Sequence, residues 1–138
     1  MGRVAVTRWV TAAALSGVGG LHLLWATGSH FPARDERALA RRITGSDVIP
    51  PRAASAVVGV GLGLVGVLAT RSTAYAPTLT THARRAAGLA LLARALTPTG
   101  LLLKGLGLPE PAPEFVRLNG IASRPLCLAL AAGLLRKR

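Results

Sequence analysis

Two arginines lie inside long apolar stretches of this chain, where a charged side chain is energetically costly. Arg94 and Arg124 each fall within a segment long enough to cross the ~30 Å hydrocarbon core of a bilayer, at ~1.5 Å per helical residue. An ionised side chain at that depth costs roughly 2.5–3.5 kcal/mol, so each arginine needs a partner or a function. Because a guanidinium matches carboxylates and phosphates, the two residues predict either contacts between helices or a site for an anionic group.

Other polar side chains are predicted at a similar depth. His22 and Trp25 share one face of the first apolar segment, because residues three apart lie on the same side of a helix. Thr97 and Thr99 follow Arg94 closely in the chain. The predicted polar pocket consists of His22, Trp25, Arg94, Thr97, Arg117, Asn119 and Arg124.

Three interpretations of this pocket stay open. In the structural one, the arginines bind loop carboxylates, freed backbone carbonyls or lipid phosphates, His22 is a hydrogen-bonded bundle residue, and Trp25 anchors the bundle at the interface. In the binding one, the arginines hold an anionic headgroup or a small carboxylate, with Trp25 against its apolar part. In the enzymatic one, His22 is the acid–base group and Arg94 stabilises developing negative charge. No acid within the apolar segments orients His22, and the sequence favours the structural interpretation.

No metal or cofactor is expected. His30 and His82 fall on opposite sides of the predicted membrane, which argues against a histidine metal site. Cys127, the single cysteine, is interpreted as a small packing residue. Residues 61–66 match the pattern G-x-G-x-x-G, but they lie within an apolar helix with no βαβ unit around it, so a dinucleotide site is not predicted.

Four apolar segments must position these residues, and they span 9–27, 53–70, 86–103 and 118–135. The chain has 138 residues, enough for one domain, and 51% are apolar without its 16 glycines, whereas soluble domains have ~45–50% with glycine included. The sequence therefore predicts an all-α fold, a single four-helix transmembrane bundle over residues 1–138. The first segment resembles a signal peptide, but its length and the lack of an A-x-A site predict that it stays as the first helix.

The connections carry their own signals. Residues 33–44 predict a short amphipathic helix with Leu39 and Ile43 on one side, ended by Gly45. Such a helix lies at the membrane interface or, equally well, is a solvated loop helix. Residues 71–85 predict a polar turn.

Prolines interrupt the last two apolar segments. Pro98 lacks the N–H that would bond to the Arg94 carbonyl, so we expect a kink that leaves a free carbonyl near a positive side chain. Pro125 predicts a bend in the last helix. Arg94 offsets the favourable insertion of the leucines around it, so the third helix is expected to depend on its neighbours.

Small residues predict close helix packing. One face of the second segment carries three glycines, Gly59, Gly63 and Gly66. In the first segment, small residues recur every four positions, at Ala12, Ser16 and Gly20. Such stripes let two helix backbones approach each other within the bundle, and an exposed stripe can also form a homo-oligomer.

The net charge of +12 indicates an anionic partner. Nucleic acid is not predicted, because the basic residues flank apolar segments and few aromatics are present to stack on bases. Anionic membrane lipids are the expected partner. The basic residues are divided almost equally between the two sides of the membrane, whereas all five acids fall on the side opposite the termini, so we expect cytoplasmic termini.

Several motifs resemble a known family. Residues 21–28 contain His22 and Trp25 in the pattern H-x-x-W-A-x-G, and the closing residues 115–119 and 125–128 read F-V-R-L-N and P-L-C-L. Together with Arg94-Ala95-Leu96, these stretches resemble the small bacterial membrane proteins of domain-of-unknown-function family 3995 over most of the chain. The resemblance implies a four-helix integral membrane protein of the bacterial plasma membrane and supplies no activity.

The chain departs from the family pattern at a few positions. Asn119 stands where the family usually has aspartate, Ser123 where it has tyrosine, and Arg124 where it has serine. Thr97 and Pro98 replace a usual glycine–aspartate pair. The acids that could neutralise the arginines in relatives are therefore missing from this chain. A structural or lipid-associated membrane protein is the expected function, with a membrane-embedded binding module or enzyme as the alternative.

Overall fold

The computed structural model describes residues 2–70, 77–105, 107 and 110–136. These residues form helices and connecting loops, and no strand occurs among them. In chain order the elements are α1 (Arg3–Ala26), α2 (Glu36–Ile43), α3 (Arg52–Thr70), α4 (Pro77–Leu96), α5 (Thr99–Gly105), α6 (Pro113–Leu118), a π-helical turn (Asn119–Ser123) and α7 (Arg124–Leu135). The predicted all-α class is confirmed.

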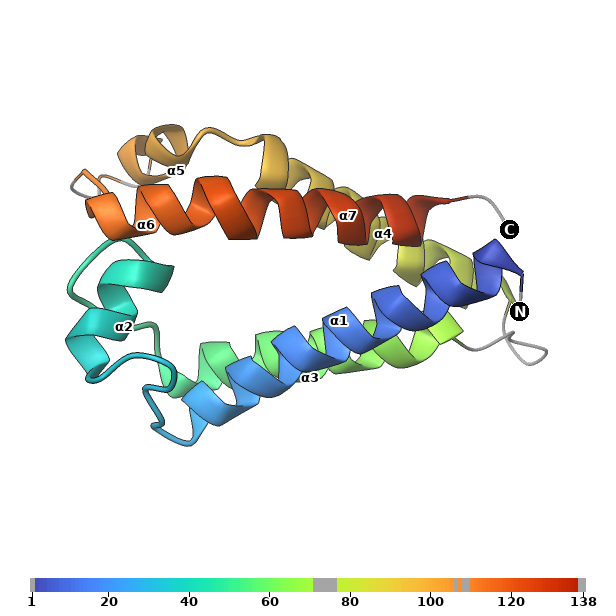
Figure 1. The fold of residues 1–138 in the computed structure, drawn as a ribbon, viewed down its shortest axis with the longest axis horizontal. Helices are drawn as coiled ribbons and strands as arrows, with labels where there is room; N and C mark the ends of the chain where they lie inside the picture. The colour runs from blue at the N-terminus through green and yellow to red at the C-terminus, as the bar shows by residue number, and fades with distance from the viewer. Residues whose placement is uncertain (1, 71–76, 106, 108–109, 137–138) are drawn as a thin grey trace.

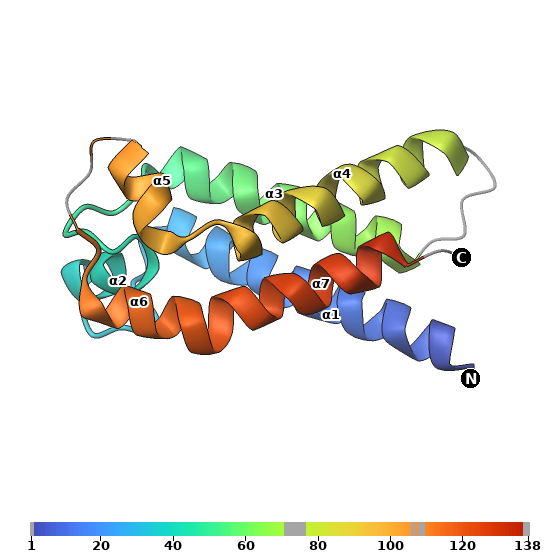
Figure 2. The same cartoon turned by 90° about the horizontal axis from the view of Figure 1, so that it is seen from above.

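The long helices form two antiparallel pairs. Helix α1 lies beside α3, and α4 lies beside the continuous stretch from α6 to α7 (Figures 1 and 2). Contacts within each pair are far more extensive than contacts between the pairs. The start of α1 and the end of α7 lie at one end of the molecule, the terminal end, whereas α2, α5 and α6 lie at the other, the loop end (Figure 1).

Among the described residues, three helices are long and apolar enough to cross a membrane. They cover Ala5–Ala26, Arg52–Thr70 and Pro113–Leu135, and 22% of the most apolar window of each is buried inside the protein. On α3, the side chains of Val57 and Leu64 are 72% and 60% exposed. Apolar helices with so little protein cover require an apolar surrounding, which a bilayer provides.

The third predicted segment has different bounds in the structure. The sequence predicted a turn over 71–85 and a span over 86–103, whereas α4 already begins at Pro77 and ends at Leu96. The chain leaves the helix before Pro98 and enters the short helix α5. Proline disfavours helical geometry in the residue before it and removes one backbone bond, which explains the break.

Helix α4 is also more polar than the other long helices. It is 20 residues long, but it contains Arg84, Arg85 and Arg94, and it is not among the three described helices that qualify as membrane-spanning by length and composition. A fourth crossing is therefore not established by the apolar character of α4 itself.

Helices α1 and α3 approach each other through glycines. A Cβ on Gly19 would lie 2.8 Å from the carbonyl oxygen of Gly59, and a Cβ on Gly66 would lie 2.8 Å from Ser16 Oγ. Real Cβ atoms do not come so close, so a larger side chain at Gly19 must push the helices apart, whereas one at Gly66 must first displace the Ser16 hydroxyl. Dispersion contacts between the two backbones replace the side-chain packing of an ordinary helix pair.

Two glycines of the predicted stripes have open space at their Cβ positions. A Cβ on Gly63 or on Gly20 would meet no atom of another segment within 4 Å, although the backbone nitrogen of Gly63 lies 3.2 Å from the Cβ position of Gly19. The neighbouring Gly19 makes the close contact on α1 instead. A four-residue spacing in the sequence therefore identified the correct helix face only approximately.

The two helix pairs meet in a small apolar core toward the terminal end. Its fully buried members are Leu15 from α1 and Leu134 from α7, each 0% exposed, joined by Ala12, Ala69 and Leu130. Since this core is small, the pairs are held together by few apolar contacts.

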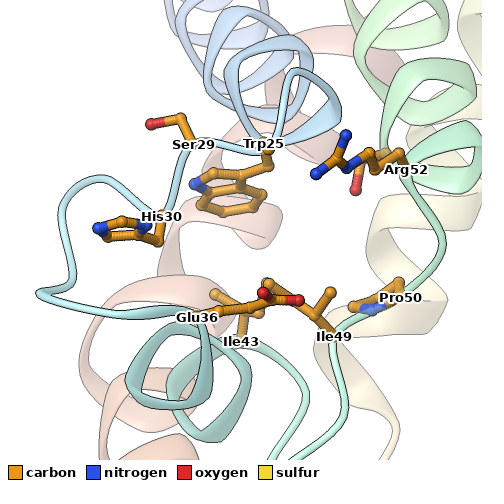
Figure 3. Close-up of a pocket in the computed structure, with 10 residues that line it drawn as sticks. Trp25, Ser29, His30, Glu36, Ile43, Ile49, Pro50 and Arg52 are labelled. Carbon is orange, nitrogen blue, oxygen red and sulfur yellow. The ribbon is translucent and has the colours of Figure 1, made fainter.

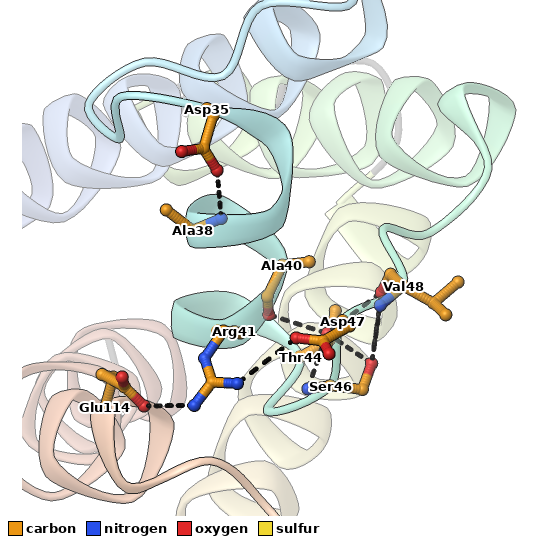
Figure 4. A network of polar contacts seen from close by, with 9 residues as sticks. All are labelled: Asp35, Ala38, Ala40, Arg41, Thr44, Ser46, Asp47, Val48 and Glu114. Carbon is orange, nitrogen blue, oxygen red and sulfur yellow. Dashed lines mark hydrogen bonds and ion pairs between the residues drawn. The ribbon is translucent and has the colours of Figure 1, made fainter.

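Helix α2 begins and packs as an amphipathic helix. The carboxylate of Asp35 accepts a hydrogen bond from the Ala38 N–H at 2.7 Å, which caps the helix N-terminus (Figure 4). Leu39 and Ala40 are buried against protein. Helix α2 is therefore folded onto the protein at the loop end.

Helix α2 is linked to α6 by charge. Arg41 forms ion pairs with Asp47 at 3.4 Å and with Glu114 at 3.5 Å (Figure 4). The Ala112 N–H also donates to the carbonyl of Gly45 at 2.8 Å. These contacts connect the first half of the chain to the second at the loop end.

Candidate functional site

The side chain of Arg94 is held by a buried amide. Arg94 Nη2 donates to Asn119 Oδ1 at 2.9 Å, and Asn119 Nδ2 donates to Thr99 Oγ1 at 2.7 Å. Asn119 is 1% exposed and joins α4, α5 and the π-helical turn. The amide oxygen satisfies a donor of Arg94 but leaves its positive charge without a neutralising carboxylate. We call these three residues the polar network.

Arg124 binds the end of α4. Its Nε donates to the Ala95 carbonyl at 2.8 Å. In a continuous α-helix, this carbonyl would accept the N–H four residues later, but the helix is broken around Pro98. The sequence predicted a freed carbonyl at Arg94, and the arginine contact is made to the next one along the chain.

The π-helical turn brings Asn119 and Arg124 to the same side. The backbone N–H of Arg124 bonds to the Asn119 carbonyl, five residues back instead of four. Pro125, directly after it, has no N–H and cannot continue the α-helical pattern. The sequence predicted a bend here but not the wider turn, which directs both side chains toward α4.

His22 and Trp25 form a second, separate group on α1. His22 Nδ1 lies 2.9 Å from the Val18 carbonyl oxygen, which can only accept. The rings of His22 and Trp25 are 4.8 Å apart, and Trp25 Nε1 donates to the Phe31 carbonyl at 2.7 Å. Among the described residues, no hydrogen bond or ion pair links this group to the polar network, so the predicted pocket is divided in two.

Two predicted members lie outside both groups. Thr97 Oγ1 donates to the carbonyl of Ala93 in its own helix at 2.7 Å. Arg117 is exposed on α6, and within the described part of the chain it has no hydrogen-bond or ion-pair partner. Neither residue contributes to a shared site.

Sequence reasoning missed a set of arginines at helix C-termini. Arg8 on α1 donates from Nη2 to the Thr70 carbonyl at 2.9 Å and from Nε to the Ala69 carbonyl at 3.3 Å, at the end of α3. The last carbonyls of a helix lack partners and carry the negative end of its dipole, so a guanidinium there is favourable.

Arg84 makes the same kind of contact in the other pair. From α4 it donates through Nε to the Leu134 carbonyl at 3.1 Å and through Nη2 to the Arg136 carbonyl at 3.5 Å, at the end of α7. Its side chain is buried. The available signal was the antiparallel pairing itself, which places the start of one helix beside the end of its partner.

Arg52, the first residue of α3, lies at the end of α1. A Cβ on Gly28 would lie 2.7 Å from Arg52 Nη2, and Gly28 has a φ of 95°, a conformation that glycine adopts without strain. Arg8, Arg84 and Arg124 each bond to a C-terminal carbonyl of the paired helix, and Arg52 lies beside Gly28, so each long helix has an arginine from its paired helix near its C-terminal end.

A small pocket of about 30 Å³ opens beside Trp25 at the loop end. Figure 3 shows the Arg52 guanidinium and the Glu36 carboxylate directed toward the space next to the indole ring, while His30 points away from it. Two serines, Ser29 and Ser55, are also among the residues that line the pocket. The pocket is far smaller than the ~300–1,000 Å³ of drug-sized ligand sites, so it suits one small polar group.

The described residues contain no cluster of three or more His, Cys, Asp or Glu side chains that could hold a metal ion. No family model, curated protein or solved structure matches the chain. The site is therefore interpreted from its own geometry.

Proposed function

We propose that the chain is a four-span integral membrane protein of the bacterial plasma membrane, a structural and lipid-associated bundle in which α4 is the fourth crossing. The observation that carries the proposal is that three arginines of the α4–α7 pair donate to protein acceptors. Arg94 binds Asn119, Arg124 binds the Ala95 carbonyl, and Arg84 binds the end of α7.

The same contacts account for a polar crossing helix. Two of the arginines that lower the hydropathy of α4, Arg84 and Arg94, are bonded to the neighbouring helix stretch. A helix that is unfavourable in lipid by itself is stabilised when its polar groups are satisfied by a partner helix. Helix α4 therefore crosses the membrane as half of a pair with α7.

The structural interpretation is favoured over an anion pocket at Arg94. A guanidinium that already donates to Asn119 or to a backbone carbonyl has fewer donors left for a ligand. His22 is likewise engaged by its own helix, which does not favour a general acid–base role.

We also propose that the termini are cytoplasmic and that the chain belongs to domain-of-unknown-function family 3995. A further part of the proposal is that the exposed basic residues of the loop end attract anionic lipids. Arg37 and Arg42 on α2 are exposed, and the lipid attraction they predict falls with salt. The family assignment rests on the sequence motifs that contain Trp25, Arg94 and Pro125.

Cysteine labelling in intact membranes tests the number of crossings. Thr78→Cys and Glu110→Cys, each in a Cys127→Ala background, place a thiol near the start of α4 and beyond α5. If α4 crosses, an impermeant maleimide labels the two positions from opposite sides of the membrane. Labelling of both from one side would contradict the fourth crossing.

Arg94→Leu tests the structural role, with exposed Arg117→Leu as the matched control. We expect Arg94→Leu to alter folding or assembly in detergent, while lipids retained in mass spectra of the folded fraction stay unchanged. A fully folded bundle that loses a co-purifying ligand would contradict the proposal and support the anion pocket.

A further inference from the structure

The pocket beside Trp25 presents two opposite charges that are not paired with each other. Arg52 and Glu36 both line it, and within the described part of the chain neither forms an ion pair with any residue. A positive and a negative group facing one small space match a ligand that carries both charges a short distance apart. A single anion would find the Glu36 carboxylate unfavourable.

The aromatic wall fits the same kind of ligand. Trp25 Nε1 donates to the Phe31 carbonyl, which fixes the ring, and the ring borders the pocket between the two charged groups (Figure 3). A tryptophan ring beside a carboxylate attracts an ammonium group. Ser55, which also lines the pocket, supplies a hydroxyl that can donate to a phosphate oxygen.

The position of the pocket indicates where such a ligand comes from. Trp25 lies in the last turn of the apolar helix α1, and Arg52 begins the apolar helix α3. Both ends of these segments fall at the height of lipid headgroups if the two helices cross the membrane, as the proposed function requires. Lipid phosphates and ammonium groups lie at that height.

We propose that this pocket binds the phosphoethanolamine headgroup of a membrane lipid. Arg52 holds the phosphate at the mouth of the pocket, while the primary ammonium enters between the Trp25 ring and the Glu36 carboxylate. An ammonium with N–H donors is preferred to the quaternary group of choline, because Glu36 accepts charge-assisted hydrogen bonds from it. A space of about 30 Å³ holds the ammonium end alone, and the rest of the lipid stays in the bilayer.

Native mass spectrometry of the full chain, released from nanodiscs with equal phosphatidylethanolamine and phosphatidylcholine, tests the proposal. We expect retained phosphatidylethanolamine in excess. Arg52→Gln is expected to lower its retention about tenfold, and Glu36→Gln is expected to abolish the preference over phosphatidylcholine. The matched controls are exposed charges outside the pocket, Arg34→Gln and Glu110→Gln, which leave retention unchanged.

A soluble headgroup distinguishes lipid from free ligand. Glycerophosphoethanolamine is titrated into the detergent-solubilised protein in a Trp9→Phe background, where Trp25 is the single tryptophan. Quenching or a spectral shift that Glu36→Gln removes supports the pocket chemistry, and a response without lipid retention assigns the source to a free molecule. Equal retention of both lipids, or preferential retention of phosphatidylcholine, overturns the proposal.

The outcome is separable from the proposed function. Arg52 and Glu36 take no part in the contacts between α4 and α7. Opposite-side labelling at positions 78 and 110, with no preference for phosphatidylethanolamine, would retain the four-span bundle and reject the pocket. Same-side labelling would reject the four-span bundle whatever the lipid result.

Discussion

The helix pair α1–α3 and the helix pair α4–α7 are both antiparallel, but different kinds of contact hold their helices together. The first pair brings two backbones together at Gly19 and Gly59. The second pair contains polar contacts between its helices, above all Arg94 bound to Asn119. Both pairs place arginines on helix C-termini, so the difference lies in how the two helices of each pair contact each other along their length.

The comparison shows why a polar helix needs its partner more than an apolar one does. Helices α1 and α3 are each apolar enough to cross a membrane alone. Helix α4 is not among the described helices with that property, and its arginines find acceptors on the α6–α7 stretch. We therefore expect substitutions that remove polar contacts to destabilise the second pair, and substitutions that enlarge a glycine to destabilise the first.

The largest effect is expected at Asn119. Asn119→Leu removes both hydrogen bonds of the buried amide, one from half-buried Arg94 and one to Thr99, which we expect to cost about 2–4 kcal/mol of unfolding free energy. Denaturation of the purified protein in detergent measures this loss. Asn119→Asp is the matched control, because it keeps an acceptor and adds a neutralising charge; a loss as large as that of Asn119→Leu would contradict the role of the contact.

The double variant Arg94→Met/Asn119→Leu sharpens the same test. With the charge removed as well, most of the stability lost in Asn119→Leu should return, because two apolar side chains replace the polar pair. Additive losses in the double-mutant cycle would show that the two residues act independently.

A smaller effect is expected at Arg84. Arg84→Met keeps the length of the side chain but removes its donors to the end of α7, and we expect a loss of about 1.5–3 kcal/mol. The neighbouring exposed residue supplies the control, since Arg85→Met removes the same charge without a buried contact. Equal destabilisation by the two variants would argue for a general charge effect instead of a helix cap.

The first pair is tested by adjacent glycines. Gly19→Ala places a Cβ 2.8 Å from the Gly59 carbonyl oxygen and should destabilise the bundle by about 1–3 kcal/mol through helix separation. Gly20→Ala meets no atom within 4 Å and is expected to be neutral or slightly stabilising. The same denaturation assay compares the two, and similar behaviour would contradict close packing at Gly19.

The smallest effect is expected between the pairs. Arg41→Gln removes exposed ion pairs with Asp47 and Glu114, which contribute about 0–1 kcal/mol and less at high salt. We expect a small shift of the unfolding midpoint that disappears in 1 M salt. A large, salt-independent loss would mean that α2 holds the two pairs together more strongly than its exposed contacts indicate.

Much of the fold could be predicted from local properties of the sequence. The segments 53–70 and 118–135 correspond closely to α3 and to the second part of Pro113–Leu135, because a long apolar run is visible without knowing its neighbours. A short helix was predicted within 33–44, and α2 occupies Glu36–Ile43. The third segment was predicted at 86–103, whereas α4 covers Pro77–Leu96. The first half of α4 is polar and does not resemble a membrane helix in the sequence.

The candidate site was less predictable. Arg94, Asn119 and Arg124 were correctly marked as polar residues in apolar surroundings, but their actual partners depend on two backbone irregularities. The break at Pro98 exposes the Ala95 carbonyl, and the π-helical turn directs Arg124 toward it. His22 and Trp25 were grouped with them by depth alone, and depth does not specify which helix face meets which.

The sequence by itself determined that this chain is helical and largely apolar, with arginines inside its long apolar segments. Hydropathy and residue type are local properties, so they can be assigned from the sequence without knowing the fold. Only the tertiary structure decided that each long helix has an arginine from its antiparallel partner at its C-terminal end, and that Arg52 and Glu36 share a pocket beside Trp25. Hydrogen bonds and pockets form between residues that are far apart in the sequence and close in space. The packing of the helices decides which residues those are.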